Sequence, residues 1–377
     1  MIFTSYSNII SPLGFSTTEN YKAVCHSKIG VRKMLMPFSE DQFCVSKIPD
    51  EIIAEKATVL KNPASHTKLE ALSLLSIQSV IDQSCIDPED ARILLIYSTT
   101  KGNIDILEGA YKNLHEQRAY LPVFAKHLQD YFKMKNRPVV LSNACISGLL
   151  AIIIAKRFIE QGNYDHVIVC GGDIISEFTI SGFKSFNAMS SEPSKPFDEN
   201  RTGINLGEAA ATILITNDKT LALPYQTQII SGASANDANH ISGPSRTGDG
   251  LFQCLKHTLA NQNKDGLGFI SAHGTATAFN DEMESIAFER AGLTTVPVNS
   301  LKGYYGHTLG AAGVLETILS LESMKHQKLI KSAGYETKGV SGNIQIIESH
   351  KESSFSSFIK TASGFGGCNA SALFSKI

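Results

Sequence analysis

The 377-residue sequence predicts a layered α/β fold whose two halves share one plan. Short apolar runs alternate with segments of helical periodicity, which is the pattern of strands and helices packed in layers. Each half contains a strand, a tight loop and a helix that begins with small residues, at 139–148 and at 296–313. This repetition favours one duplicated body over two independent domains, and we divide it into the halves 1–217 and 218–377.

Two kinds of apolar pattern locate the elements of the first half. Apolar residues that recur every three or four positions predict helices, and short continuous apolar runs predict buried strands. The expected helices are 69–81 and 147–159, and the expected strands are 93–97, 139–141, 167–170 and 211–215. We expect Gly171-Gly172 to close the strand 167–170, and the polar turn 217–223 to mark the seam between the halves.

The second half follows the same alternation. The expected helices are 281–291 and 309–324, and the expected strands are 267–270, 296–298, 344–347, 358–361 and 370–374. The segment 363–369 is a glycine-dense turn between the last two strands. Because no helix follows this turn, it is neither a dinucleotide-binding fingerprint nor a P-loop.

Composition excludes several classes of protein. Hydrophobic residues make up 42% and charged residues 19%, so neither disorder nor a coiled coil is the main architecture. The 34 basic and 36 acidic residues leave no large basic field, and we expect neither nucleic acid nor a membrane surface as a partner. The longest apolar run, 149–155, is far shorter than the ~20 residues of a membrane span, and the N-terminus lacks a signal-peptide pattern.

Cys145 stands out among seven cysteines that are odd in number and lack a CxxC pair. That usage is typical of a reducing cytoplasm and of neither a disulfide framework nor a zinc site. Cys145 lies between a buried strand and the start of a helix, beside Ala144, Ser147 and Gly148. The positive end of the helix favours a thiolate there. The alternative is that Cys145 is a buried cysteine that acts as a small hydrophobic residue.

Two histidines lie in glycine-rich segments near strand ends. His273 stands in the segment 271–277, directly after a strand, and His307 stands in the segment 302–313. The carboxyl ends of strands are where α/β proteins assemble their sites, and glycines let a ligand approach the backbone. A lone histidine of this kind is more often structural, but two of them with Cys145 favour a Cys-His-His site. A metal site lacks the common ligand spacings, and a Cys-His hydrolase leaves the second histidine without a task.

These segments together resemble the β-ketoacyl-acyl carrier protein synthases, the elongating Cys-His-His members of the thiolase superfamily. The resemblance rests on 143–148, 272–277, 302–313 and 364–367, with support from 196–203, 207–208 and 236–240. The motifs stand in the family's order and span nearly the whole chain. The resemblance implies a thiolase-like αβαβα layered fold. It also implies a dimer, formed with an identical chain or with a related chain that sets product length.

The resemblance further implies a decarboxylative Claisen condensation. In this reaction Cys145 takes an acyl group from a carrier-protein thioester. His273 and His307 donate hydrogen bonds to the malonyl thioester oxygen, where negative charge develops as carbon dioxide leaves. Lys302 acts through its charge and is held by Glu316 in the following helix, because an unpaired buried ammonium is strongly disfavoured.

The remaining implied roles concern substrate binding. The backbone N–H groups of Cys145 and Phe365 would form an oxyanion hole, and the ring of Phe365 would gate the acyl pocket. Thr275 and Thr277 match positions that hydrogen-bond a pantetheine arm. Because the substrates ride on the phosphopantetheine of an acyl carrier protein, we expect that protein as a cytoplasmic partner and no separate cofactor or metal.

Departures from the family pattern bear on the product. Ser363 stands where an aromatic residue is common, Ala209 where glycine is usual, and Tyr304-Tyr305 where smaller residues are usual. The segment 101–137, which helps shape the acyl tunnel and the dimer edge, is shorter than in fatty-acid elongation enzymes. We therefore favour a specialised pathway, such as an aryl-polyene or other polyketide-type product. Two alternatives stay open: a non-catalytic, chain-length-setting subunit and a Cys-His thioester hydrolase.

Overall fold

One large mixed β-sheet runs through the molecule. The computed structural model describes residues 1–223, 227–260, 262 and 266–376, and its main sheet has 11 strands. From edge to edge these are β13 (Gln345–Ile346), β11 (Pro297–Asn299), β10 (Leu267–Ser271), β15 (Ser357–Gly364), β16 (Cys368–Lys376), β9 (Thr227–Asn236), β1 (Phe3–Ile10), β8 (Ala209–Thr216), β6 (His166–Asp173), β4 (Ile93–Ser98) and β5 (Val139–Leu141). A short pairing of β1 with β9 joins its two halves.

The two halves of the sheet repeat the same strand directions. In the first half β5, β4 and β6 are parallel, and β8 and β1 continue the sheet in antiparallel fashion. In the second half β11, β10 and β15 are parallel, and β16 and β9 continue antiparallel. The predicted duplicated α/β body is therefore confirmed. The boundary at 217/218 lies in the loop between β8 and β9 and stays a prediction.

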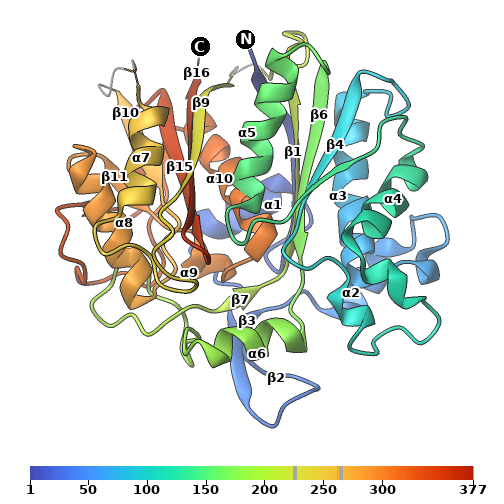
Figure 1. Ribbon diagram of the computed structural model, residues 1–377, viewed down its shortest axis with the longest axis horizontal. Helices are drawn as coiled ribbons and strands as arrows, with labels where there is room; N and C mark the ends of the chain where they lie inside the picture. Colours follow the sequence, from blue (N-terminus) through green and yellow to red (C-terminus); the bar gives the residue numbers. More distant parts are fainter. Residues whose placement is uncertain (224–226, 261, 263–265, 377) are drawn as a thin grey trace.

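Helices lie between the half-sheets and over their outer faces, which gives five layers in the order αβαβα (Figure 1). The middle layer holds α1 (Thr17–Cys25), α5 (Ser147–Glu160) and α10 (Ala312–Lys325); α3 (Lys68–Ser84) and α4 (Leu121–Phe132) cover the first half-sheet, and α7 (Asp249–Thr258) and α8 (Ala278–Arg290) cover the second. Buried apolar side chains form one cluster around the inner helices and one under each outer pair. Each outer pair of helices thus has its own hydrophobic core against the sheet, separate from the core around the inner helices.

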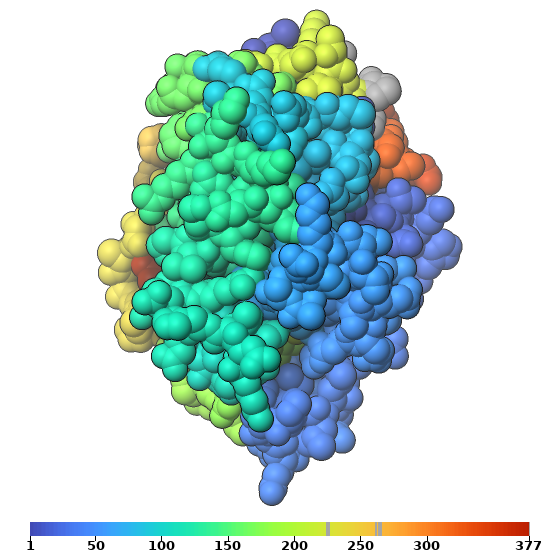
Figure 2. Space-filling model, turned by 90° about the vertical axis from the view of Figure 1, so that its right-hand side faces the viewer, coloured from blue at the N-terminus to red at the C-terminus, as the bar shows by residue number. Residues whose placement is uncertain are grey.

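The remaining elements are short. They are the helices α2 (Asp50–Ala57), α6 (Glu177–Ser185) and α9 (Lys302–Tyr305); the 3₁₀ helices η1 (Pro63–Ser65), η2 (Ile104–Ile106), η3 (Glu116–Ala119) and η4 (Leu309–Ala311); and the strands β2 (Arg32–Leu35), β3 (Gln42–Ser46), β7 (Leu206–Gly207), β12 (Lys328–Leu329) and β14 (Lys351–Glu352). Figure 2 shows the outer face of the first half, where blue to teal segments form most of the surface. No helix in the described part of the chain is long and apolar enough to cross a membrane.

The expected strands and helices are present, with ends that shift by a few residues. One local prediction is wrong, because Gly171-Gly172 does not close its strand: both glycines lie inside β6 and pair with β8. A Cβ on Gly171 would lie 2.6 Å from Ser98 Oγ, so this glycine permits close packing rather than a turn. The helix expected at 309–324 begins as the 3₁₀ turn η4 and becomes α-helical at Ala312.

Glycines at the start of α5 and α10 let these two central helices touch backbone to backbone. A Cβ on Gly148 would lie 2.9 Å from the Gly310 carbonyl oxygen, and one on Gly313 would lie 2.2 Å from the Leu149 nitrogen. Contacts this close leave no room for a larger residue. Residues 312–324 of α10 are all buried, and most of them are apolar or small, as expected for a helix packed on every side. The contact brings the loop before α5 against the loop before α10.

We expect Gly313→Ala to lower the free energy of unfolding by about 1–3 kcal/mol, because the added methyl group overpacks the contact between α5 and α10. Gly182→Ala in α6 is the matched control, since nothing lies within 4 Å of its Cβ and helices favour alanine over glycine. Urea denaturation followed by circular dichroism measures both variants. A Gly313→Ala protein as stable as the wild type would show that the two helices tolerate the extra atom.

Candidate active site

The loop between β5 and α5 presents Cys145 at the N-terminus of a helix. Ala144 has a left-handed φ of +45°, which turns the chain sharply just before the helix. The Ser147 hydroxyl secures this turn, since it donates to the Ala144 carbonyl at 2.6 Å and accepts the Asn143 N–H at 2.8 Å. The expected strand-to-helix elbow is therefore present, and Cys145 is buried in it.

Cys145, His273 and His307 meet in one cluster. His273 follows β10 and His307 follows α9, and their ring centroids lie 5.1 Å apart in an edge-to-face arrangement. The Cys145 sulfur and one nitrogen of each ring all lie within 4.8 Å of one another. All three residues are buried, although they come from three separate loops. The structure thus brings together the three residues that the sequence singled out.

Burial keeps both imidazoles neutral at neutral pH. Loss of hydration lowers the pKa of His273 and that of His307 well below 6.5, and the Lys302 ammonium lowers both further. Neither ring nitrogen of His307 has a hydrogen-bond partner among the described residues. A buried polar group without a partner is costly, so this imidazole is available to a ligand in the site.

Burial also governs the thiol. It raises the pKa of Cys145 to about 12, against the opposing charges of Lys101 and Lys302. The expectation that the helix N-terminus favours a thiolate is therefore wrong, because loss of hydration, the largest cause of the shift, disfavours the charged form. The thiol must lose its proton while it reacts rather than beforehand.

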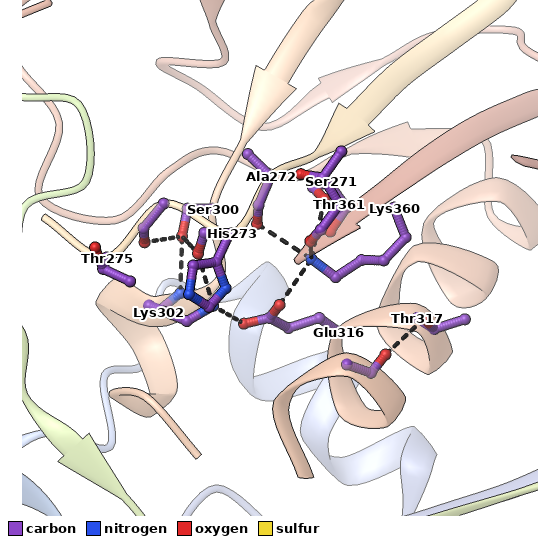
Figure 3. Close-up of polar contacts among 12 residues, drawn as sticks. Ser271, Ala272, His273, Thr275, Ser300, Lys302, Glu316, Thr317, Lys360 and Thr361 are labelled. Atoms are coloured by element: carbon purple, nitrogen blue, oxygen red, sulfur yellow. Dashed lines mark hydrogen bonds and ion pairs between the residues drawn. The ribbon is translucent and has the colours of Figure 1, made fainter. Parts of the chain in front are cut away.

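A buried ionic network lies beneath His273 (Figure 3). Lys302 Nζ lies 2.7 Å from Glu316 Oε1 and donates to the His273 carbonyl at 2.6 Å. Lys360 Nζ lies 2.8 Å from the second oxygen of the same carboxylate, Glu316 Oε2. The expected contact between Lys302 and Glu316 is present. The sequence analysis missed Lys360, although a lysine inside the buried strand β15 was a signal that it has a partner.

Two further buried carboxylates hold the loop that follows β10. Glu284 accepts the backbone N–H groups of His273 at 2.8 Å and Gly274 at 2.6 Å. Asp281 accepts the Thr275 N–H at 2.9 Å, and burial raises the pKa of Asp281 to about 6. Both carboxylates stand one turn apart on α8, so they face the same loop. The sequence analysis missed both, although their spacing of three residues was a signal.

The cluster opens into a cavity of about 480 Å³. The expected site residues that line it are Cys145, His273, His307, Thr275, Thr277 and Phe365. Lys302 and Glu316 do not line the cavity but lie behind His273. The volume is within the range of small-molecule sites.

The residues that depart from the family pattern lie in two different environments. Ser363 lines the cavity, whereas Tyr304 and Tyr305 are buried in the apolar cluster around the inner helices. The two tyrosines therefore fill the core and do not contact a ligand. Within the cavity lining, the ring centroid of Phe365 lies 5.5 Å from that of Phe183 on α6.

The turn between β15 and β16 packs directly against the elbow. A Cβ on Gly364 would lie 3.0 Å from the Cys145 backbone nitrogen, so only glycine allows this approach without a shift of the backbone. Phe365 follows Gly364 immediately in the chain. The two backbone N–H groups expected to act together, those of Cys145 and Phe365, thus belong to segments in contact.

Two clusters among the described residues have ligand atoms close enough to hold a metal ion. They are Cys145 with His273 and His307, and Glu70 with His66 and His127. The ammonium groups of Lys302 and Lys360 behind His273 disfavour a cation in the first cluster. In the second, Arg118 already binds the Glu70 carboxylate through contacts of 2.8 and 2.7 Å. Neither arrangement favours a metal, and the absence of one stays a prediction.

Two protein-family models match the chain. The model of the β-ketoacyl synthase N-terminal domain matches residues 117–220, and that of the β-ketoacyl synthase C-terminal domain matches residues 227–336. The first matched range contains Cys145 and the second contains His273, His307 and Glu316. Lys360 and Phe365 lie beyond both ranges.

Similar sequences come from organisms that are far apart. The chain is 28% identical to a putative mitochondrial 3-oxoacyl-[acyl-carrier-protein] synthase of Schizosaccharomyces pombe, with 97% of each chain covered. It is 24% identical to 3-oxoacyl-[acyl-carrier-protein] synthase 2 of Coxiella burnetii, with 98% of this chain and 97% of the relative covered. It is 30% identical to the tetracenomycin polyketide synthase ketoacyl synthase alpha subunit of Streptomyces glaucescens, over 63% of this chain and 59% of the relative.

Solved structures share the fold. A β-ketoacyl synthase of Burkholderia phymatum superimposes with a TM-score of 0.88 at 21% identity, with 100% of this chain and 99% of that chain covered. A ketosynthase of Xenorhabdus doucetiae, solved in complex with its chain length factor, gives a TM-score of 0.82 at 24% identity, with 100% and 98% covered. The expected thiolase-like αβαβα fold is confirmed.

We expect the protein to lose stability as the pH falls below about 6.5. Both buried histidines are neutral in the folded chain, so only the unfolded chain gains their protons between that pH and their lowered pKa values. Each histidine adds up to about 1.4 kcal/mol per pH unit to the slope. Urea unfolding of the wild type and of His307→Gln, at several pH values, measures it. An equal slope in the two proteins would contradict the neutral, buried state of His307.

Proposed function

The chain belongs to the β-ketoacyl synthase family, and on that premise we propose that it catalyses decarboxylative condensation. In this reaction an acyl group on Cys145 is joined to a malonyl unit that acyl carrier protein delivers. The observation that carries the proposal is the convergence of a thiol and two neutral imidazoles, within 4.8 Å, in one cavity. The enzyme is an acyltransferase that forms carbon–carbon bonds, and its substrates on phosphopantetheine require no further cofactor.

The first step transfers the acyl group to Cys145. The sulfur attacks the carbonyl carbon of the acyl thioester, and the pantetheine thiol leaves with the proton that Cys145 gives up. Because burial disfavours the thiolate, the proton moves during the attack, and we assign its relay to His307, which has a ring nitrogen within 4.8 Å of the sulfur. The N–H groups of Cys145 and Phe365 stabilise the oxyanion, and the ring of Phe365 gates the acyl pocket.

The second step breaks the bond between the malonyl carboxylate and its α-carbon. Carbon dioxide leaves, and the electron pair moves onto the thioester oxygen, which accepts hydrogen bonds from His273 and His307. A neutral imidazole has one N–H to donate, so the lowered pKa values suit this role. The enolate carbon then attacks the acyl carbonyl, the bond to the Cys145 sulfur breaks, and the thiolate that leaves takes up a proton from solvent.

Lys302 acts without touching the substrate. Its ammonium binds the His273 carbonyl and favours the neutral imidazole, and Glu316 holds the ammonium in place. Thr275 and Thr277 line the same cavity, and their hydroxyl oxygens lie 2.9 Å apart. We assign them to the pantetheine arm.

We assign the protein to a cytoplasmic pathway in which it forms a dimer with itself or with a related chain. The Streptomyces relative is named as a subunit of a polyketide synthase, and the Xenorhabdus neighbour was solved with a chain length factor. The first name favours a polyketide-type product, and we propose an aryl polyene or another product of that type. The relatives named 3-oxoacyl-[acyl-carrier-protein] synthase make fatty-acid elongation the alternative pathway.

A chain-length-setting subunit without activity is the second candidate, since such a partner accompanies one structural neighbour. The complete set of Cys145, His273 and His307 argues against it. A Cys-His thioester hydrolase is a third candidate, and it needs a group that orients the histidine through its ring. No carboxylate among the described residues bonds to a ring nitrogen of either histidine, which argues against a hydrolase.

We expect Cys145→Ala to abolish formation of the acyl-enzyme, because no other described thiol lines the cavity. We expect His273→Ala to keep acylation but to lose condensation by a factor of about 10²–10³, the usual cost of one oxyanion donor. Intact-mass analysis after mixing with acyl-carrier thioesters measures acylation, and product analysis with malonyl carrier protein measures condensation. Full condensation by Cys145→Ala would sink the proposal, and free acid released without a malonyl donor would favour the hydrolase.

We expect the purified chain alone to decarboxylate malonyl carrier protein, because the three catalytic side chains all come from one chain. Released carbon dioxide is the readout. Cys145→Gln is measured beside the wild type, because its neutral side chain occupies the position of the acyl group. No turnover alone, but turnover with a co-expressed relative, would show that the active form is a heterodimer. No turnover in either case would favour the non-catalytic role.

A further inference from the structure

Lys360 is a fully buried lysine that the proposed steps leave without a task. It lies in β15, in the buried segment 358–362, and its side chain is 0% exposed. A buried ammonium is strongly disfavoured unless it is paired and hydrogen-bonded. Burial lowers the pKa of Lys360, and the negative charge of Glu316 opposes that shift. Its contacts therefore show what this charge does.

Two of those contacts hold the end of β10 that leads to His273. Lys360 Nζ donates to the carbonyl of Ser271 at 3.0 Å and to that of Ala272 at 3.2 Å. It also binds Glu316 Oε2 at 2.8 Å and the Thr361 carbonyl at 2.6 Å. Lys360 does not line the cavity.

Lys302 binds the next backbone carbonyl along the chain, that of His273. Its ammonium donates to the His273 carbonyl at 2.6 Å and binds Glu316 Oε1 (Figure 3). The carbonyls of three successive residues, 271–273, therefore accept from two ammonium groups that share one carboxylate. Glu284 accepts the His273 N–H at 2.8 Å. The backbone that carries the imidazole is thus held by charged groups at its N–H and at its carbonyls.

We propose that Lys360 is a positioning residue for decarboxylation, which works through Glu316 and the end of β10 to hold the His273 imidazole toward the substrate. This inference rests on the proposed function, because it assigns His273 to the enolate oxygen. It concerns the second step alone. The acyl-transfer step uses the Cys145 elbow, which Lys360 does not touch.

The pH dependence separates this role from a purely structural one. The charged or titratable groups around His273 are Lys302 on α9, His307 before η4, Glu316 on α10, Glu284 on α8, Lys360 on β15 and Cys145 before α5. Lys360 is among the positive charges that lower the pKa of His273. Its removal raises that pKa, so the acid limb of decarboxylation moves to higher pH. If Lys360 were purely structural, its removal would change the yield of folded protein and leave the pH of the acid limb of decarboxylation unchanged.

The test compares the dimeric wild-type protein with Lys360→Met, which keeps the length of the side chain and removes the charge. Ser371→Ala is the control, because it removes a buried hydrogen bond to Thr258 on α7 without touching the site. Intact mass of the acyl-enzyme measures the first step, and carbon dioxide released from malonyl carrier protein at several pH values measures the second. Lys360→Gln, which keeps N–H donors without the charge, is the second variant if Lys360→Met does not fold.

We expect Lys360→Met to acylate within about threefold of the wild type and to lose decarboxylation by about 30- to 100-fold, the scale of a misplaced catalytic group, with its acid limb shifted upward. Ser371→Ala should match the wild type in both steps. An equal loss in both steps, an unmoved acid limb, or failure of both Lys360 variants to fold would assign the lysine to the fold and overturn the inference. Absence of decarboxylation in the wild type would instead remove the proposed function, and the inference with it.

Discussion

The carboxylate of Glu316 is the charge on which the rest of the site depends. It lies inside α10, a helix buried on every side, where it is accessible only to groups that the fold brings to it. Lys302 binds one of its oxygens and Lys360 the other. Removing one member of such a cluster leaves an uncompensated buried charge, so the loss of any one of the three residues destabilises the other two. Through the two ammonium groups this carboxylate holds the backbone that carries His273.

The position of α10 is set in turn by glycine. Gly148 on α5 and Gly313 on α10 allow a backbone contact that any side chain would prevent. This contact brings the elbow of Cys145, from the first half, to the histidines of the second half. The site therefore exists only at the junction of two half-sheets, each of which alone would present an incomplete set of groups.

Removal from water gives the reactive groups their chemistry. The same burial that holds the thiol neutral also holds both imidazoles neutral. Neutral imidazoles donate hydrogen bonds to developing negative charge. The neutral thiol loses its proton only when it reacts with a substrate. The nearby lysines lower the pKa of His273 further because like charge disfavours its protonation. The pKa values of the two histidines are thus lowered mainly by loss of hydration and to a smaller extent by the nearby lysines.

The sequence by itself determined the layered α/β plan, the elbow at Cys145 and the identity of the two histidines, because these depend on local periodicity and on turn residues next to strand ends. It did not identify Lys360, Glu284 or Asp281, whose partners lie far away in the chain or bind through backbone groups. It also misassigned Gly171 to a turn and Cys145 to the thiolate form. Only the tertiary structure decided those points, because close packing, desolvation and the partners of a buried charge are set by segments that meet after folding.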